Sequence, residues 1–571
     1  MSWIIGIYGR NITPGIIDQI ENLHSSPLFR IKEDHHCFIL SGGNPETLHY
    51  HRTQDGFIVA AGLGIDIQHG RAEIVSTDTW RSMITQESNE WQQKLNGQFV
   101  ALSFTKFSMN FFSDRVGLRT MYFARTDHGI MFSTRLTWLT QFLSSSSIDW
   151  KIFGSKWTSV NQFSYRALLQ KIDRLPPNGH IVIKNDSLTI DQTPWITPMT
   201  VPGSTGETKQ LLSSLLRMPE RHLKLGLSGG LDSRTLLAVL TSETKNFSTY
   251  SFGDEKEPDN ILSKKIATEE NCTHHNYSFP FPSQEKCLHL LRSYIQQSNL
   301  TAPAFGALQS QYYPYINAHT GIQIDGGGGE IARRQLLNRL LVWGRRDVYD
   351  LHPERILSRL KTHRGDFFTD EINHTMIDGA VEDLDGLLHR LPNPALIGIE
   401  HFLDLWGAQI TIPNVACDEQ ARIDEHTINF MPFSQPDFMN NVLQLPVRFR
   451  KNNRLFKEII REKRPSLTKY PLIKNGVVYP YRLSMIQARL WMKAASVVRP
   501  PFRNELPHRF LLTTKEFVLD TVHSSDVKNY QPYNYDKILA MITAYYRGEE
   551  RFVFQINWWI AFDVWRRMVE K

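Results

Sequence analysis

The chain has 571 residues, of which 41% are hydrophobic and 21% charged, and Lys plus Arg exceed Asp plus Glu by 64 − 58 = 6. This length is too great for one compact core, so we expect two or more domains in a soluble globular protein. The mild basic excess is spread along the chain, which suits anionic ligands such as ATP and argues against a nucleic-acid partner, because no dense Lys/Arg run occurs.

Neither membrane insertion nor secretion is indicated. No run approaches the roughly 18 apolar residues of a membrane span, and the apolar start Trp3–Tyr8 lacks the basic lead and small-residue cleavage site of a signal peptide. Cys37, Cys272, Cys287 and Cys417 form neither a CxxC pair nor a zinc spacing, which favours reduced thiols. We therefore expect a cytoplasmic protein with no membrane partner.

The first two hundred residues have the pattern of a β-rich domain. Short apolar runs, separated by Gly, Asn, Asp and Ser, recur at 3–8, 38–40, 57–61, 99–104 and 131–133. Such runs predict packed antiparallel sheets. The stretch 193–208 is rich in Pro and Gly and reads as a linker. We therefore predict domains at 1–205 and 206–571.

A strand, a glycine turn and a helix start follow one another after residue 222. Leu223, Leu225 and Leu227 alternate as one face of a strand does, Ser228-Gly229-Gly230 breaks the run, and apolar residues resume at helical spacing from Arg234. Such a turn gathers backbone N–H groups and a positive helix end, which suits a phosphate. The predicted nucleotide-binding residues are Leu227, Ser228, Gly229, Gly230, Leu231, Asp232 and Ser233.

Particular side chains of this loop suit a nucleotide. Gly229 and Gly230 allow a close backbone approach, the two serines add hydroxyl donors, and the Asp232 carboxylate can hold Mg²⁺ beside phosphates. It is not a Walker loop, because the Gly-Lys-Ser/Thr ending is missing. An ordinary strand-to-helix turn remains the alternative.

Phe247–Phe252 predicts a second buried strand, followed by a helix over 260–271 and a further strand within 272–279. Ligands of open α/β sheets bind beyond the carboxyl ends of strands. The backbone of Ser251 and Phe252 is therefore a candidate for adenine contact. The acidic residues just beyond, at 254, 255 and 257, fit either a ligand site or a solvated loop.

Four successive glycines follow a strand-like run at 321–324. Four glycines in a row are entropically costly, which argues that they have a specific role. We therefore expect Gly326, Gly327 and Gly328 to approach a triphosphate or an acyl-adenylate, with a flexible loop of no specific role as the alternative. Asp325 and Glu330 flank the run as metal candidates. A helix is predicted over the next segment, with Leu336, Leu337, Leu340 and Leu341 on its core face and arginines at 333, 334, 339, 345 and 346 on a solvated or substrate-facing side.

Three further segments, Asn96–Val100, Ser113–Phe123 and Arg174–His180, precede Ser-Gly-Gly-Leu-Asp-Ser in this order. Together they resemble the glutamine-hydrolysing (class B) asparagine synthetase family. That resemblance implies an α/β and α+β two-domain fold. Its N-terminal domain is an Ntn-hydrolase-like, glutaminase-type β-sandwich, and its C-terminal domain is an α/β ATP-pyrophosphatase (PP-loop) synthetase. It also implies ATP and Mg²⁺ as cofactors.

Two departures from the family affect the expected chemistry. Ser2 stands where active members have a cysteine nucleophile, and a hydroxyl is far less ionised than a thiol. The resemblance therefore implies a structural N-terminal domain more than a working glutaminase. Gly329 stands where the family has an aspartate that holds a second Mg²⁺, so either Asp325 or Glu330 binds that metal or the metal is held differently.

The later part of the chain supplies candidate catalytic residues. Pro432-Phe433 keeps the centre of a family stretch, and Asp418 and Glu419 before it are candidates for the acid that orients an attacking amine, with surface carboxylates as the alternative. The family also places a lysine-bearing loop near its transition state. Lys474, or secondly Lys457, would there neutralise charge on departing pyrophosphate. The aromatic-rich 552–568 predicts a packed terminal helix.

The resemblance implies an ATP-dependent amide-forming ligase that acts through an acyl-adenylate and releases AMP and pyrophosphate. Without the thiol, the amine is expected on the substrate, as in the β-lactam synthetases and the macrolactam cyclases of lasso peptides. The leading interpretation is an intramolecular cyclase of natural-product biosynthesis that takes a carboxylate-bearing peptide or small molecule, with a protease or a precursor-peptide-binding protein as partner. The alternatives are intermolecular amidation of a metabolite, sugar acid or protein with ammonia or another amine, and a catalytically degenerate scaffold.

Overall fold

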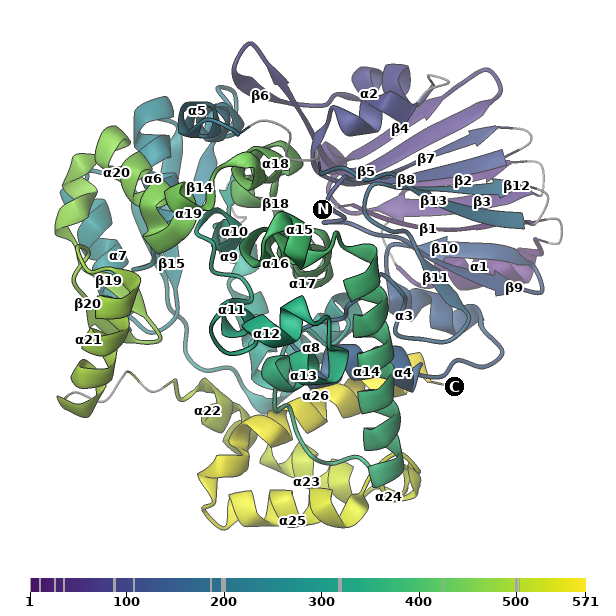
Figure 1. Cartoon of the computed structure of the whole chain (residues 1–571). Coiled ribbons are helices and arrows are strands. Elements are labelled where there is room, and N and C mark those ends of the chain that lie inside the picture. The colour runs from purple at the N-terminus through teal and green to yellow at the C-terminus, as the bar shows by residue number, and fades with distance from the viewer. Residues whose placement is uncertain are drawn as a thin grey trace.

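The computed structural model describes residues 2–9, 12–24, 27–33, 36–85, 89–105, 108–184, 187–196, 202–316, 321–424, 426–498, 502 and 504–570. It is a mixed α/β protein (Figure 1). Antiparallel sheets built from the first two hundred residues lie at the upper right of that view, a parallel sheet lies at the left, and the last helices lie below.

The N-terminal strands form two antiparallel sheets. One has the order β11 (Ile172–Arg174), β9 (Tyr122–Thr126), β10 (Gly129–Ser133), β1 (Trp3–Tyr8), β3 (Cys37–Gly42), β2 (Pro27–Glu33). The other has the order β13 (Ser187–Gln192), β12 (Gly179–Lys184), β8 (Ser108–Ser113), β7 (Asn96–Thr105), β5 (Gly56–Gln68), β4 (Leu48–Arg52), and β6 (Arg71–Ile74) also pairs with β5. The predicted apolar runs all fall on these strands, which confirms the antiparallel sheets.

Alternation along the strands explains why the sheets stack. On β5, Phe57 and Val59 enter the core between the two sheets, whereas Ile58 and Ala60 face the opposite side. That outer side is covered by α2 (Thr77–Ile84), whose Trp80 is fully buried. The outer face of the other sheet is covered by α1 (Pro14–Glu21) and α3 (Leu136–Leu139). The central strands of both sheets are therefore buried on both faces, whereas the edge strand β13 is exposed.

The motif residue Asp114 is a structural centre of this region. Its buried carboxylate accepts hydrogen bonds from five backbone N–H groups, those of Phe99, Val116, Gly117, Leu118 and Arg119. The loop after β8 is thereby closed onto β7. Asp114 belongs to the 113–123 segment, one of those on which the family resemblance is based, and its role here is to hold a turn of the fold.

We predict that Asp114→Ala destabilises the protein strongly. An unsatisfied buried donor costs about 1–3 kcal/mol, and five donors lose their acceptor, so we expect a loss of at least about 3 kcal/mol in the free energy of unfolding. Chemical denaturation measures it. Asp55→Ala, at an exposed position, is the matched control and should change stability by under about 0.5 kcal/mol; equal effects of the two variants would contradict the assignment.

The C-terminal part contains a parallel sheet of order β16 (His274–Tyr277), β15 (Phe247–Phe252), β14 (Leu223–Gly226), β17 (Ile322–Ile324), β18 (Ile428–Phe430). The strands predicted at 223–227, 247–252, 272–279 and 321–324 are confirmed within a few residues. After β14 the chain first builds one side of the sheet and then crosses to the other. The carboxyl end of β14 is therefore a topological switch point, where open α/β sheets bind ligands.

The helices, from α4 on, are α4 (Trp150–Thr158), α5 (Thr205–Leu216), α6 (Leu231–Glu243), α7 (Pro258–Glu269), α8 (Gln284–Ser298), α9 (Tyr313–Ile316), α10 (Gly329–Ala332), α11 (Asn338–Trp343), α12 (Arg345–Tyr349), α13 (Pro353–Leu360), α14 (Asp370–Arg390), α15 (Pro394–Ile397), α16 (Ile399–Trp406), α17 (Ile412–Asp424), α18 (Pro436–Gln444), α19 (Val447–Arg450), α20 (Arg454–Lys463), α21 (Met485–Val498), α22 (Leu506–Thr513), α23 (Lys515–His523), α24 (Ser525–Asn529), α25 (Tyr535–Tyr546) and α26 (Val553–Val569). The predicted terminal helix is confirmed as α26. Within the described ranges, no helix is long and apolar enough to cross a bilayer.

Two predictions about local structure are corrected. Residues 333–346 do not form one helix, because Arg334 and Leu337 have φ of 53° and divide the segment between α10, α11 and α12. The predicted linker is also shorter than 193–208, since α5 begins at Thr205 with Ser204 as its N-cap; residues 197–201 lie outside the described residues.

Polar contacts join the N-terminal sheets to the parallel sheet. Asn96 Nδ2 donates to Asp437 Oδ2 over 2.7 Å, and Arg115 pairs with the other oxygen of the same carboxylate at 2.6 Å. Gln98 Nε2 donates to the backbone carbonyl of Asn429 in edge strand β18. The motif beginning at Asn96 therefore lies at the junction between the two sheet systems.

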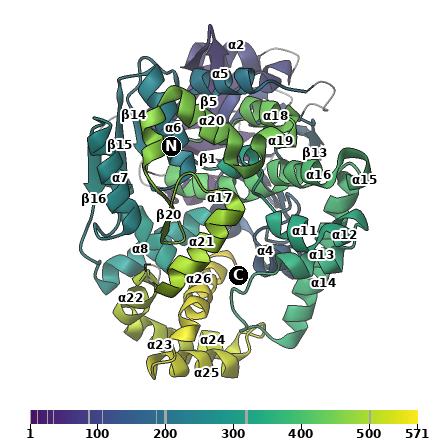
Figure 2. The same cartoon turned by 60° about the vertical axis from the view of Figure 1, so that its left-hand side comes forward.

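A short hairpin, β19 (Leu472–Lys474) with β20 (Val477–Tyr479), and helix α21 lie at the outside of the molecule, at the left of Figure 1 and towards the viewer in Figure 2. Trp491 of α21 donates to the carbonyl of Val478. The hairpin matters because Lys474 is its last residue before the turn.

Candidate functional site

A cavity of about 640 Å³ lies at the carboxyl ends of β14, β15 and β17. Its size is typical of small-molecule sites. Ten predicted site residues from four separate segments line it: Leu227, Ser228, Ser251, Phe252, Asp325, Gly326, Gly327, Gly328, Glu330 and Glu419. The fold thus brings the loop, the end of β15, the glycine turn and α17 to one place.

The loop is closed by its own serines. The Ser228 and Ser233 hydroxyls lie 3.0 Å apart, the Ser228 N–H donates to Ser233 Oγ, and the Gly230 N–H donates to Ser228 Oγ. Gly230 is the N-cap of α6, and Leu231 at its first position is buried. The helix therefore points its positive N-terminal end at the loop, as expected of an anion-binding turn.

A carboxylate already occupies one loop donor. The Gly229 N–H donates to Asp259 Oδ1 over 2.8 Å, and Asp259 belongs to the first turn of α7 and lines the cavity. This N–H thus already donates to a carboxylate oxygen. A phosphate oxygen would accept the same kind of hydrogen bond.

At the end of β15 the side chains of Ser251 and Phe252 are engaged with other protein groups, which leaves their backbone for contact with a ligand in the cavity. The Ser251 hydroxyl bonds Asn276 and His274 of β16, and the Phe252 ring stacks on Tyr312 at 5.1 Å between centroids. Of the acidic residues beyond the strand, 254 and 255 are exposed, whereas Glu257 is half-buried and lines the cavity.

The four glycines pack closely against protein atoms. Gly326, Gly327 and Gly328 also line the cavity, so their approach to a nucleotide stays a prediction. A Cβ on Gly327 would lie 2.8 Å from Met431 Sδ, and one on Gly328, whose φ is 83°, would lie 2.2 Å from Ser434 Oγ. A Cβ on Gly329 would lie 2.7 Å from Asp232 Oδ1, and one on Gly326 would lie 3.1 Å from Asp232 Cβ. The turn is therefore fixed between Asp232 and the 431–434 segment, which also argues against a flexible loop.

Asp232 is held behind this turn by Arg333. Arg333 Nη2 donates to Asp232 Oδ2 over 2.6 Å and lies 3.6 Å from Glu330 Oε1. Burial raises the pKa of the Asp232 carboxyl to about 7, although the Arg333 guanidinium acts in the opposite direction. Asp232 Oδ1 is buried and has no hydrogen-bond partner among the described residues.

Lys474 is close enough to Asp232, Glu330 and Arg333 for their charges to act on it. Burial lowers the pKa of its ammonium, with a further lowering from Arg333 and an opposite effect from Glu330 and Asp232. Its strand is tied to the loop, because the Ile473 N–H donates to the Gly229 carbonyl over 3.0 Å. Buried Arg234 of α6 adds bonds to the carbonyls of Tyr470 and Pro471. The hairpin that ends at Lys474 is thereby bonded to the predicted phosphate loop through Ile473, while the Lys474 residue itself is exposed.

Lys457, the second lysine candidate, is placed elsewhere. Its Nζ donates to the Leu483 carbonyl and lies 5.3 Å from the centre of the Tyr481 ring. Neither Lys457 nor Lys474 lines the cavity, but only Lys474 lies on the hairpin that is bonded to the loop. Lys457 therefore supports the segment that follows the hairpin, and the structure does not bring it to the site.

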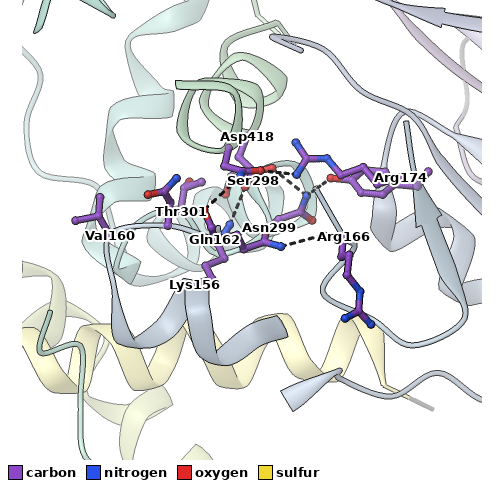
Figure 3. A network of polar contacts seen from close by, with 12 residues as sticks. Lys156, Val160, Gln162, Arg166, Arg174, Ser298, Asn299, Thr301 and Asp418 are labelled. Atoms are coloured by element: carbon purple, nitrogen blue, oxygen red, sulfur yellow. Dashed lines mark hydrogen bonds and ion pairs between the residues drawn. The ribbon is translucent and has the colours of Figure 1, made fainter. Parts of the chain in front are cut away.

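The two carboxylates of α17 face different cavities. Glu419 lines the large one, whereas Asp418 is buried, pairs with Lys156 Nζ at 2.7 Å and accepts from Asn299 over 3.1 Å. Figure 3 shows Asp418 among these partners, with Arg174 nearby. The structure therefore does not bring Asp418 to the large cavity, where Glu419 lies. Neither carboxylate is the exposed surface residue of the alternative interpretation.

Ser2 and Asp418 line a second, much smaller cavity of about 40 Å³. The Ser2 hydroxyl donates to the Thr47 carbonyl over 2.6 Å, and Arg119 binds the Ser2 carbonyl. Such a volume holds a few water molecules, and not a glutamine. None of the four cysteines forms a disulfide in the described structure.

The metal ligands predicted as a set are not assembled. Among the described residues no three His, Cys, Asp or Glu side chains form a group that could hold a metal. Arg333 stands between Asp232 and Glu330, and Asp325 Oδ1 accepts from the Gly327 N–H over 2.7 Å. Mg²⁺ however needs only one or two carboxylates when phosphates supply its other ligands, and the unpartnered Asp232 Oδ1 fits that role.

Sequence reasoning missed three residues of the site: Arg333, Asp259 and Arg234. The sequence pattern groups Arg333 with surface arginines, although its side chain is only 11% exposed. The one signal for Arg234 is its place inside the apolar run of α6, where an arginine requires partners.

No family model matches the chain, and no curated protein matches it. Among solved structures, the chain is similar to the glutamine phosphoribosylpyrophosphate amidotransferase of B. subtilis complexed with ADP and GMP, at 12% identity and a TM-score of 0.23, over 58% of this chain and 77% of the other. It is also similar to a structure described as the allosteric regulatory enzyme of purine biosynthesis, at 13% identity and a TM-score of 0.23, over 67% and 91% of the two chains. At these scores the likeness carries no argument about activity.

Proposed function

We propose that the protein is an ATP-dependent ligase that forms an amide through an acyl-adenylate and releases AMP and pyrophosphate. One observation carries the proposal. The loop that begins at Ser228, at the switch point of the parallel sheet, and the glycine turn between Asp325 and Glu330 line the same cavity. The hairpin that carries Lys474 is hydrogen-bonded to that loop. This combination of a helix N-terminus, a buried carboxylate and a lysine suits charge that grows on phosphates. The order of the parallel sheet and the two antiparallel sheets are consistent with the PP-loop and Ntn-type domains of the asparagine synthetase resemblance.

The reaction is a pair of substitutions. A substrate carboxylate oxygen attacks the α-phosphorus of ATP, and the bond from that phosphorus to the bridging oxygen breaks, so that pyrophosphate leaves. An amine nitrogen then attacks the acyl carbon, loses a proton, and AMP leaves. Binding both reactants in one cavity supplies the proximity contribution.

The chain's own groups have distinct roles in this scheme. The loop from Ser228 to Ser233 binds the phosphate tail through its N–H groups and helix end. Lys474 offsets the charge of departing pyrophosphate. The backbone at Ser251 and Phe252 orients the adenine, and Glu419, which lines the same cavity, faces the acyl or amine substrate. Mg²⁺ held at Asp232, when bound, neutralises phosphate charge and fixes the tail.

The small size of the cavity at Ser2 favours an amine that does not come from glutamine. We therefore propose an intramolecular macrolactam or lactam cyclase of natural-product biosynthesis, similar in chemistry to the lasso-peptide cyclases. Its substrate is a carboxylate-bearing peptide or small molecule. A protease or precursor-peptide-binding protein is the proposed partner.

The proposal is tested by ATP–pyrophosphate exchange with [³²P]pyrophosphate and a library of carboxylate-bearing peptides and metabolites. Exchange that depends on one class of acid supports adenylation, and mass spectrometry of the product then separates the chemistries. Loss of one water from a single substrate indicates cyclisation, whereas addition of an amine mass contradicts the cyclase. Failure of every acid to support exchange, with nucleotide binding intact, contradicts the ligase.

We predict that Ser2→Ala leaves exchange unchanged within about twofold, because Ser2 lines only the small cavity and not the large one. Its lost hydrogen bond to Thr47 should lower stability by about 1 kcal/mol. Glutamate release from glutamine, measured with a coupled dehydrogenase, is expected to be absent in both proteins. Glutamine-dependent product formation that Ser2→Ala removes would overturn this account.

A further inference from the structure

The Arg333 guanidinium lies between the carboxylates of Asp232 and Glu330. Its Nη2 lies 2.6 Å from Asp232 Oδ2 and 3.6 Å from Glu330 Oε1. Its Nη1 donates to Gln335 Oε1 over 3.0 Å, and its guanidinium lies 5.9 Å from the centre of the Phe456 ring. The side chain is therefore fixed on several sides, and only 11% of it is exposed.

The neighbouring turn leaves no room for a further acidic ligand. A Cβ at position 329 would lie 2.7 Å from Asp232 Oδ1 and 2.8 Å from its Cγ. An aspartate at 329 would therefore displace the Asp232 carboxylate from Arg333. The ion pair between Asp232 and Arg333 therefore depends on glycine at position 329.

Two buried atoms of this arrangement remain unsatisfied. Asp232 Oδ1 and Arg333 Nε have no hydrogen-bond partner among the described residues. A buried acceptor and a buried donor of this kind carry a cost that a ligand can remove. One Mg²⁺ at the carboxylate oxygen and one phosphate oxygen at the guanidinium N–H would satisfy both.

We propose that Arg333 is a built-in cation for the phosphate tail of the nucleotide, and that it replaces a second metal ion at this site. The inference rests on the proposed function, since it assumes that a nucleoside triphosphate binds at the Ser228–Ser233 loop. Asp232 then binds a single Mg²⁺ through its free oxygen, while its other oxygen and Glu330 hold the guanidinium in place. Arg333 is a binding residue for the phosphates and positions Asp232.

The test counts metal ions directly. The full-length protein is saturated with α,β-methylene-ATP, which it cannot cleave between the α- and β-phosphates, and titrated with Mn²⁺ while free Mn²⁺ is followed by electron paramagnetic resonance. We expect one Mn²⁺ per bound nucleotide for the natural protein. Arg333→Gln keeps a polar side chain but frees both carboxylates, so we expect two. Arg345→Gln, at an exposed position, is the matched control and should keep one.

Nucleotide affinity gives a second, independent readout. At one equivalent of Mn²⁺, Arg333→Gln should bind the analogue about 10–100-fold more weakly, because a hydrogen bond to a charged group is lost. Excess Mn²⁺ should recover most of that loss, and Arg333→Lys should retain the single-metal stoichiometry. Two Mn²⁺ in the natural protein, or one in Arg333→Gln at unchanged affinity, would overturn the inference. Absence of analogue binding to the natural protein would instead contradict the proposed function.

Discussion

Asp232→Asn is expected to lower ATP–pyrophosphate exchange by about 10³-fold or more. The substitution keeps the volume of the side chain but removes the charge that holds Mg²⁺ beside the phosphates, which is worth several kcal/mol of transition-state stabilisation. The unpartnered Oδ1 is the atom concerned. Initial exchange rates at saturating ATP measure the effect.

Folding should be little affected by the same change. The pKa of Asp232 is raised to about 7 by burial, so a neutral side chain is tolerated there, and Arg333 keeps Glu330 as a partner at 3.6 Å. Asp254→Asn, at an exposed position beyond β15, is the matched control for charge. An Asp232→Asn enzyme with more than a tenth of the natural exchange rate would remove Asp232 from the metal site.

Lys474→Met is expected to reduce exchange by about 10²–10³-fold, the usual effect of removing one electrostatic contact to a developing charge. Methionine preserves the apolar stem of the lysine, so the hairpin should remain bonded to Gly229 through Ile473. The loss should appear mainly in the maximal rate, because the charge on pyrophosphate grows as the bond breaks.

A matched variant separates charge from position. Lys469→Met removes an exposed lysine that lies shortly before the hairpin and pairs with Glu269 of α7. It should change the rate by less than about twofold, because exposed ion pairs contribute little. The charge-conserving replacement Lys474→Arg should recover part of the activity. Equal rates for Lys474→Met and the natural enzyme would show that another group carries the role.

The strands and the loop could be predicted from sequence because their patterns are local. Alternation in Leu223–Leu227 and the continuous apolar run at Trp3–Tyr8 mark strands that are buried in the fold. The glycine turn before α6 likewise follows from residue type alone. The predicted cavity residues therefore meet, since the carboxyl ends of parallel strands share one edge.

The contacts between distant segments could not be predicted in this way. Arg333 and Asp232 are 101 positions apart, and the pair forms only because β14 and β17 are neighbours. Asp418 and Glu419 are adjacent in sequence, yet one faces the Ser2 cavity and the other the large cavity, because successive residues of a helix point in different directions. The packing of the glycines from 326 to 329 against Asp232, Met431 and Ser434 could not be predicted either, because these neighbours come from distant parts of the chain.

The most direct test of the account is a crystal structure of the protein with α,β-methylene-ATP and Mg²⁺. We predict the phosphate tail against the N–H groups of the Ser228–Ser233 loop, with a metal ion at Asp232 and the adenine near the backbone of Phe252. A nucleotide bound at another place, with the cavity at the end of β14 empty, would contradict the central claim.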